Sequence, residues 1–136
     1  MYTIMFRNLL FAALLVLVFS GVVLAQDEQA PVFTFADQKH DFGDIVQGDV
    51  VEHSFEFTNT GNMPLIISNV ITTCGCTAPS WPKEPVKPGE KAKIKIVFNS
   101  TGKIGRQNKV VTILSNTSNQ KERLHIQANI IPKAGS

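Results

Sequence analysis

Apolar and polar side chains alternate with a period of two along three segments of this 136-residue chain. The segments are Val51–Thr58, Lys91–Phe98 and Arg123–Ile130, in which every second residue except His53 is apolar. Side chains of a β-strand point alternately to its two faces, so each segment is predicted to be a strand with one buried face. Beyond Pro31 no helical periodicity competes with this pattern.

Three more strands are predicted at Val32–Ala36, Leu65–Thr72 and Lys109–Ser115, the last two with β-branched residues on both faces. Residues typical of turns separate the strands, at Gln47–Asp49, Asn59–Asn62, Lys87–Glu90, Thr101–Gly105 and Asn116–Asn119. Pro88-Gly89 fits the two central positions of a type II turn.

Four prolines lie between Pro79 and Pro88, so Pro79–Gly89 is predicted to be an irregular crossing or an edge segment. About seven short strands without a helix predict an all-β fold, an antiparallel β-sandwich. An antibody-type domain would need two distant cysteines that bridge the sheets, and this chain has no such pair.

The first 25 residues resemble a secretory signal peptide in composition. Arg7 precedes an apolar run, Leu9–Phe19, and Val23-Leu24-Ala25 is typical of a cleavage site. A retained membrane anchor is the alternative, but a spanning helix needs about 20 apolar residues and this run is interrupted by Ser20-Gly21. We therefore expect cleavage after Ala25, a periplasmic or secreted protein, and no membrane span in the mature chain.

The remainder of the chain is predicted to form one domain. Its parts are a linker at 26–31, the sandwich at 32–131 and a tail at 132–136. Its length is sufficient to bury about 65% of the unfolded surface without covalent cross-links.

Acidic and basic residues are segregated along the sequence. Gln26–Thr60 has eight acids and one base, while Gly61–Ser136 has eleven bases and three acids. In a compact domain this division produces two oppositely charged faces or cancels across neighbouring strands. The net charge is only +2, and no basic run is interleaved with aromatic residues, so nucleic-acid binding is not expected.

Cys74 and Cys76, the only two cysteines, are separated by Gly75. The first interpretation is structural: a local disulfide or two small buried side chains. Loop entropy for so short a ring is worth only about 1.6 kcal/mol, so a disulfide here would set the local conformation and add little global stability.

Two chemical interpretations of the same pair remain open. A small-ring disulfide is readily reduced and would suit thiol exchange, although the usual redox pair has two intervening residues at the start of a helix. Two thiolates could instead hold a soft ion such as Cu(I), whereas zinc would need two further ligands. The candidates for these are His40, His53 and His125, none of them adjacent in sequence.

The histidines also have simpler explanations. His53 shares its face with Phe55 and Phe57, where a single histidine is more often a hydrogen-bonded core residue than a metal ligand. His40 and His125 are expected to be ordinary surface residues. No cofactor is implied.

Two features are candidate contacts for a partner. Lys91, Lys93 and Lys95 line one face of a predicted strand, which suits a polyanion but is more typical of solvated lysines that discourage edge pairing. Trp81 lies between prolines and either contacts a partner or packs under its own loop.

No constellation of catalytic residues is recognisable in the sequence. It contains no glycine-rich phosphate loop, nucleophile elbow or paired metal-binding histidines. Asp41 and Asp44 flank Phe42-Gly43 and are more typical of turn formation than of an acid–base pair. The protein is therefore not expected to be an enzyme, with disulfide exchange through the two cysteines left open.

Four motifs together resemble one protein family. They are Phe-Glu-Phe-Thr-Asn-Thr-Gly at Phe55–Gly61, Pro-Leu-Ile-Ile at Pro64–Ile67, Cys-Gly-Cys-Thr at Cys74–Thr77 and Pro-Gly-Glu at Pro88–Glu90. The chain from His40 to Ile131 is similar to the bacterial domain of unknown function 1573. The resemblance implies an exported, immunoglobulin-like sandwich related to the hydin and major-sperm-protein group, and it implies no activity.

These observations predict an exported, non-catalytic binding or scaffold module of the bacterial cell envelope. Its partner is expected to be another envelope protein, bound along an exposed strand edge or through the loops near Cys74–Trp81. The alternative is a thiol-redox or copper-handling protein that acts through Cys74-Gly75-Cys76.

Overall fold

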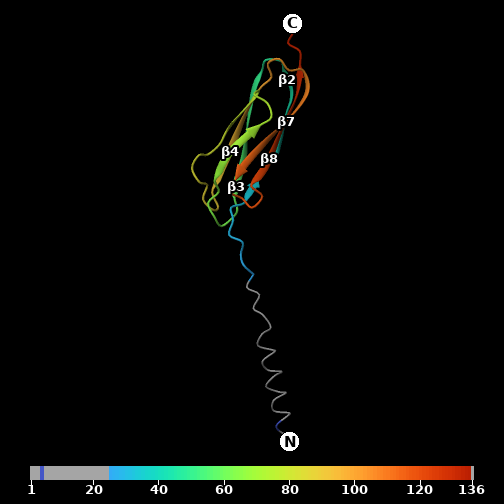
Figure 1. The fold of residues 1–136 in the computed structure, drawn as a ribbon. Coiled ribbons are helices and arrows are strands. Elements are labelled where there is room, and N and C mark those ends of the chain that lie inside the picture. The colour runs from blue at the N-terminus through green and yellow to red at the C-terminus, as the bar shows by residue number, and fades with distance from the viewer. Residues whose placement is uncertain (1–3, 5–24, 136) are drawn as a thin grey trace.

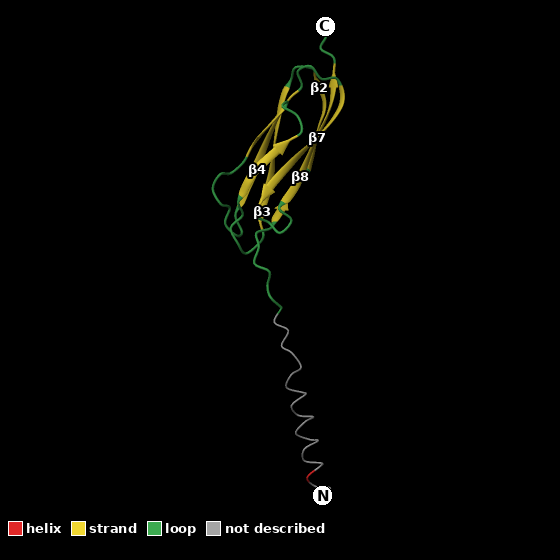
Figure 2. Ribbon diagram, viewed as in Figure 1, coloured by secondary structure: helices red, strands yellow, loops and turns green. Residues whose placement is uncertain are grey.

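Two four-stranded sheets face each other across the buried side chains of the domain (Figures 1 and 2). The computed structural model describes residue 4 and residues 25–135, and within 25–135 it has eight strands and no helix. The strands are β1 (Phe33–Phe35), β2 (Lys39–Val46), β3 (Val50–Asn59), β4 (Ile67–Thr72), β5 (Thr77–Ser80), β6 (Lys91–Asn99), β7 (Gly105–Ser115) and β8 (Lys121–Ile131). The order is β1-β3-β6-β5 in the first sheet, here sheet A, and β2-β8-β7-β4 in the second, sheet B. The predicted all-β sandwich is confirmed.

The predicted signal peptide lies outside the described residues, apart from Ile4 and Ala25. In the described part of the chain, no helix has the length and apolar character needed to cross a bilayer.

The two strands that the sequence did not reveal, β2 and β5, are both edge strands. β2 runs parallel to β8, whereas all the other pairs are antiparallel, and its register shifts between Asp41 and Asp44. That bulge interrupts the period-two pattern. Asp41 was therefore correctly expected to organise a local bend, since its Oδ1 accepts the Gly43 N–H at 2.8 Å, but the bend lies inside a strand.

The chain changes sheets five times, and two of these changes join two edge strands. Between β1 and β2 it passes from sheet A to sheet B along one side of the sandwich. Between β4 and β5 it returns from sheet B to sheet A along the opposite side. Cys74 and Cys76 lie in this β4–β5 crossing.

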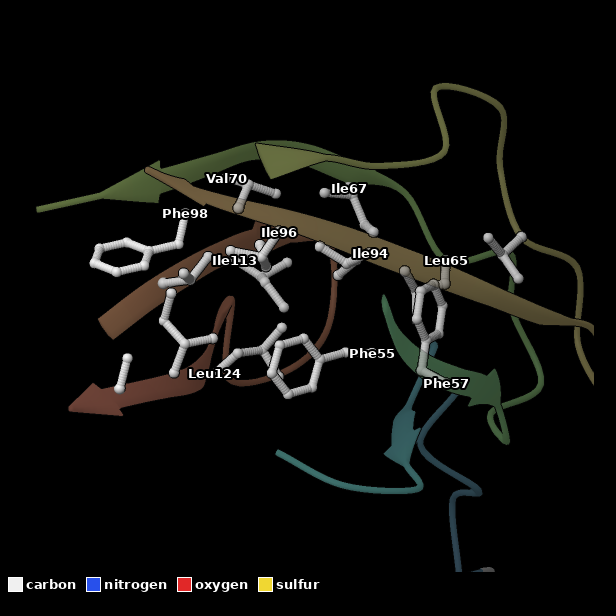
Figure 3. Packing of buried hydrophobic residues seen from close by; sticks show 14 of the residues in the cluster. Phe55, Phe57, Leu65, Ile67, Val70, Ile94, Ile96, Phe98, Ile113 and Leu124 are labelled. Atoms are coloured by element: carbon white, nitrogen blue, oxygen red, sulfur yellow. The ribbon is translucent and has the colours of Figure 1, made fainter. Parts of the chain in front are cut away.

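The core is formed by the inward-facing positions of the alternating strands (Figure 3). Phe55 and Phe57 of β3 are 1% and 2% exposed, and Ile94 and Ile96 of β6 are fully buried. Burial of each such side chain stabilises the fold by about 1.5–3 kcal/mol relative to exposure. The predicted core face of these two strands is therefore confirmed.

Asn59 at the end of β3 is a fully buried amide that ties three loops together. Its Oδ1 accepts the N–H groups of Val32 at 3.2 Å and Gly61 at 3.1 Å. Its Nδ2 donates to the carbonyl groups of Met63 and Val86, both at 2.8 Å. All four hydrogen-bonding sites of the amide are thus satisfied, which offsets the cost of burying it.

The two turns that contain Gly61 and Gly89 need glycine for different reasons. A Cβ on Gly61 would meet the Ala30 carbonyl oxygen, so this position requires close backbone approach. Gly89 has a φ of +81°, and the Glu90 N–H donates to the Lys87 carbonyl at 3.0 Å. The predicted type II turn at Pro88-Gly89 is confirmed.

The segregated charges cancel across neighbouring strands. Acidic β3 lies beside basic β6, where Lys95 Nζ is 3.6 Å from Glu52 Oε2. Across sheet B, Arg106 donates to Asp41 at 2.7 Å. Of the two arrangements compatible with the sequence, the structure therefore has the neutralised one at these positions.

Candidate functional site

The cysteine pair forms a disulfide at the corner between β4 and β5. The two Cα atoms are 5.2 Å apart, and the Cys76 N–H donates to Cys74 Sγ at 3.2 Å. Thr72 Oγ1 donates to the Cys74 carbonyl at 3.2 Å and to the Thr77 carbonyl at 3.3 Å. Both cysteines are half-buried while Gly75 is exposed. The corner is thus held by side-chain hydrogen bonds as well as by the disulfide.

The disulfide corner is continuous with sheet A. The Asn99 N–H donates to the Cys76 carbonyl at 2.8 Å, which connects the corner to the end of β6. No group of three histidine, cysteine, aspartate or glutamate side chains among the described residues could hold a metal ion. The chemistry that this corner can perform as it stands is disulfide exchange.

Trp81 does not present its ring as a bare contact surface. It is half-buried against the core, and Lys83 Nζ lies 3.1 Å from the ring centre. This cation–π contact covers one face of the indole. Of the two explanations for Trp81, the structure favours packing under its own loop.

Lys91, Lys93 and Lys95 are all exposed on the outer face of sheet A, as expected. The register places Lys93 opposite Glu56 and Lys95 opposite Ser54, with Glu52 two residues from Ser54 on the same face of β3. The lysines therefore alternate with acidic residues of the neighbouring strand and do not form a purely basic surface.

The predicted site residues do not form a single site. Lys91 lies at the beginning of β6, and the disulfide corner contacts its end at Asn99. Each group is therefore an independent candidate.

A pair of stacked histidines was not foreseen in the sequence. The rings of His40, on β2, and His53, on β3, have centroids 3.6 Å apart and planes 6° from parallel. His40 and His125 are both half-buried, so their prediction as ordinary surface residues is wrong, and only His40 joins the stack. The prediction failed because β2 was not recognised, and only β2 brings His40 against sheet A.

The pKa of His53 is lowered from its ordinary value. The largest cause is desolvation by burial, followed by the positive charge of His40, while the carboxylate of Asp37 acts in the opposite direction. The pair closes the side of the sandwich where the chain passes from β1 to β2. Its role is therefore to join the two sheets at this side.

Next to this pair, part of β3 has no neighbour on one side. β1 pairs with Phe57–Asn59 and the Ala36 N–H donates to the Glu56 carbonyl, so among the described strands Val50–Phe55 pairs with β6 alone. Figure 1 shows β3 extending along the length of the domain. We call Val50–Phe55 the β3 edge. It is a second candidate site, for a partner that pairs backbone to backbone.

The fold and these sites define a class of protein: an immunoglobulin-like β-sandwich with a cysteine pair at one corner and an open strand edge. The chain belongs to the family described as "Protein of unknown function (DUF1573)", whose model matches residues 33–130. The resemblance seen in the sequence is confirmed. No curated protein sequence matches the chain.

Solved structures share the fold. A protein of unknown function from Porphyromonas gingivalis W83 has a TM-score of 0.65 at 20% identity, over 74% of this chain and 47% of that one. The ASH/PapD-like domain 7 of human CEP192 has a TM-score of 0.64 at 11% identity, over 83% and 94%. The YadV chaperone has a TM-score of 0.54 at 13% identity, over 76% and 54%. The chain thus spans about half the length of the first and third of these proteins.

Proposed function

We propose that this protein is an exported, non-catalytic binding module of the bacterial cell envelope. The observation that carries the proposal is the β3 edge. There the backbone of β3 has no neighbouring strand on one side in the described part of the chain, whereas the core between the sheets is filled. Free strand edges bind extended segments through main-chain hydrogen bonds. Export is supported by the apolar sequence that precedes Gln26.

The comparisons support this proposal at the level of fold. One of the similar structures is described as a chaperone, YadV. At 13% identity this likeness concerns the fold alone, and function depends on the site grafted on it. No assigned activity accompanies the family.

Two measurements test the proposal. Mass spectrometry of the exported protein should find an N-terminus at Gln26, and a product that begins at Met1 would contradict processing. The purified protein, immobilised, should retain a specific protein from an envelope extract and show no disulfide reductase activity. Reductase activity without any retained protein would favour thiol exchange over binding.

The Cys74–Cys76 disulfide supports thiol exchange as the competing function. In that reaction a substrate dithiol would lose two electrons and two protons and become a disulfide, while Cys74 and Cys76 become thiols. Thiol titration before and after a reductant, and metal analysis of protein purified without chelator, distinguish this function from binding. A Cys74→Ser, Cys76→Ser variant that retains partner binding supports the binding module.

A further inference from the structure

The backbone of the β3 edge is oriented to accept another strand. Two hydrogen bonds mark the side of β3 that β1 occupies. The Thr60 N–H donates to the Val32 carbonyl at 3.0 Å, and the Ala36 N–H donates to the Glu56 carbonyl at 3.2 Å. In an antiparallel ladder, alternate residues bond to alternate sides. The N–H and C=O groups of Glu52 and Ser54 therefore point to the same side as those of Glu56, where β1 has already ended.

The other strand edges in the described part of the chain are short or interrupted, and β1 has only three residues. Pro79 of β5 lacks an N–H at a position that faces away from β6. The Cys76 carbonyl accepts the Asn99 N–H of β6, so alternation turns Ala78 toward β6 and Pro79 outward. β2 has a register shift between Asp41 and Asp44, and β4 has one near Ile67. Bulges and prolines of this kind prevent further strands from pairing. The β3 edge has neither.

A shallow depression of about 260 Å³ adjoins the β3 edge where β1 ends. Ala36 and Asp37 line one side of it, and Phe55 and Glu56 line another. Its volume is below the roughly 300–1,000 Å³ of small-molecule pockets, and it suits one long side chain of a bound segment.

Charge indicates which side chain fits. The carboxylates of Asp37 and Glu56 line the depression, and neither forms an ion pair within the described residues. One cation, Lys93, lies at the same rim, so the carboxylates outnumber it. A lysine or arginine could lay its aliphatic stem against Ala36 and bring its charge to the two carboxylates.

The same charges oppose pairing between two copies of this chain. Antiparallel pairing of the β3 edge with itself would bring Glu52 and Glu56 of one copy close to those of the other. Like charges across a strand pair are destabilising. The edge is therefore better suited to a different protein with basic residues.

We infer that the β3 edge, Val50–Phe55, accepts an extended basic segment of a partner protein as an additional strand of sheet A, with one basic side chain in the depression between Asp37 and Glu56. This inference rests on the proposed function, because it names the site and the chemistry of the partner that the binding module would recognise. Main-chain bonds to Glu52 and Ser54 provide the pairing, and the two carboxylates provide the selectivity.

A synthetic peptide of alternating lysine and valine is the probe, with a glutamate–valine peptide as its charge control. Hydrogen exchange of the full protein, followed by NMR, should show slower exchange of the Glu52 and Ser54 amides with the lysine peptide only. The Thr77 amide on the β5 edge should not change.

Two variants separate pairing from charge. Ser54→Pro removes the outward N–H without removing a bond to β6 and should weaken binding of the lysine peptide by about tenfold, whereas Ser54→Thr should leave it unchanged. Asp37→Asn with Glu56→Gln should weaken binding about threefold, which is the value of an exposed ion pair. Circular dichroism checks that each variant remains folded.

Three results would overturn the inference. They are unchanged Glu52 and Ser54 exchange at saturating lysine peptide, equal binding of the glutamate peptide, and a dimer of this chain paired through β3. Capture from an envelope extract distinguishes the two proposals. If Ser54→Pro still captures the same envelope protein, the β3 edge is wrong and the binding module stands; if no variant or native protein captures any, the binding module itself fails.

Discussion

The imidazole rings of His40 and His53 stack face to face, with centroids 3.6 Å apart, and so connect the edge of sheet B to sheet A. Each ring also meets a phenylalanine edge-on: His40 contacts Phe42 at 4.6 Å and His53 contacts Phe55 at 4.7 Å. Aromatic pairs at such distances are worth about 0.5–1.5 kcal/mol beyond the area they bury. The contact depends on protonation, because two imidazolium rings would repel each other at this distance.

Acid is expected to destabilise the protein through this pair. The folded-state pKa of His53 is lowered, mainly by desolvation and then by His40. A lowered histidine pKa means that the unfolded chain binds the proton first. The contribution of His53 to stability is therefore complete above its unfolded-state pKa of about 6.5 and is lost as the pH falls through its folded-state pKa. Urea unfolding between about pH 7 and pH 5 should show a decreasing free energy of unfolding.

Two variants test the origin of that slope. His53→Phe retains an aromatic ring and removes the proton site, so the slope should become shallower. His125→Gln alters a histidine outside the stack and should leave the slope as it is. Equal slopes in the native protein and in His53→Phe would show that the pair does not govern the response to acid. The pKa of Asp41 is lowered by the Gly43 N–H and then by Arg106, so its contribution to stability is complete above the unfolded value of 3.8 and is lost only below that pH.

Replacement of Asn59 by alanine should be among the most destabilising changes at a polar position. The variant leaves four backbone groups without the bonds that the buried amide makes, and their desolvation is no longer compensated. We expect a loss of about 3 kcal/mol in the free energy of unfolding. Asn62→Ala is the matched control, because Asn62 accepts one exposed bond from Ala30 and should cost below about 1 kcal/mol. Similar losses in both variants would contradict the role of Asn59.

Two glycine-to-alanine variants should behave in opposite ways. A Cβ at Gly61 would overlap the backbone of Ala30 and Pro31, so Gly61→Ala should lose about 2–3 kcal/mol, a cost typical of overpacking. A Cβ at Gly75 meets nothing within 4 Å, so Gly75→Ala should change stability little. Thermal unfolding followed by circular dichroism provides the comparison. A stable Gly61→Ala protein would mean that the segment preceding β1 can shift to accommodate the added methyl group.

Loss of the disulfide should change the corner more than the fold. The Cys74→Ser, Cys76→Ser variant should lose at most about 1.6 kcal/mol, because the ring spans only three residues. Hydrogen exchange should accelerate at Thr77 and Asn99, whose amides are tied to the corner at 3.2 and 2.8 Å. Global unfolding of the variant would assign the disulfide a larger structural role than its ring size allows.

Much of the fold could be predicted from β3 and β6, since their alternation identifies the buried face from Phe55 to Ile96 directly. β2 was missed because its bulge at Asp41–Asp44 breaks the period and its residues resemble a turn. β5 was missed because Pro79 disfavours strand structure, although an edge strand tolerates a proline whose missing N–H faces outward. Both strands that were missed are edge strands. Hydrogen bonding to their one neighbouring strand, and not the local sequence pattern, determines that these segments are strands.

The candidate site was predictable only in part. Cys74 and Cys76 were evident from spacing, and the structure decided that they form a disulfide in the loop that joins β4 of sheet B to β5 of sheet A. The β3 edge could not be foreseen, because it exists only through the early end of β1 at Phe35. The sequence shows where strands form, but not how far each one is covered by its neighbour.

The sequence by itself determined the sandwich and its core, since a period of two is a local property that can be recognised within each strand without knowledge of its neighbours. The tertiary structure alone decided which strands became neighbours: it placed Glu52 beside Lys95 and His40 against His53, and it left the outer edge at Glu52 and Ser54 without a neighbour among the described strands. These relationships join residues distant in the chain. Their free energies depend on distance and burial, which arise only when the strands are assembled into two sheets.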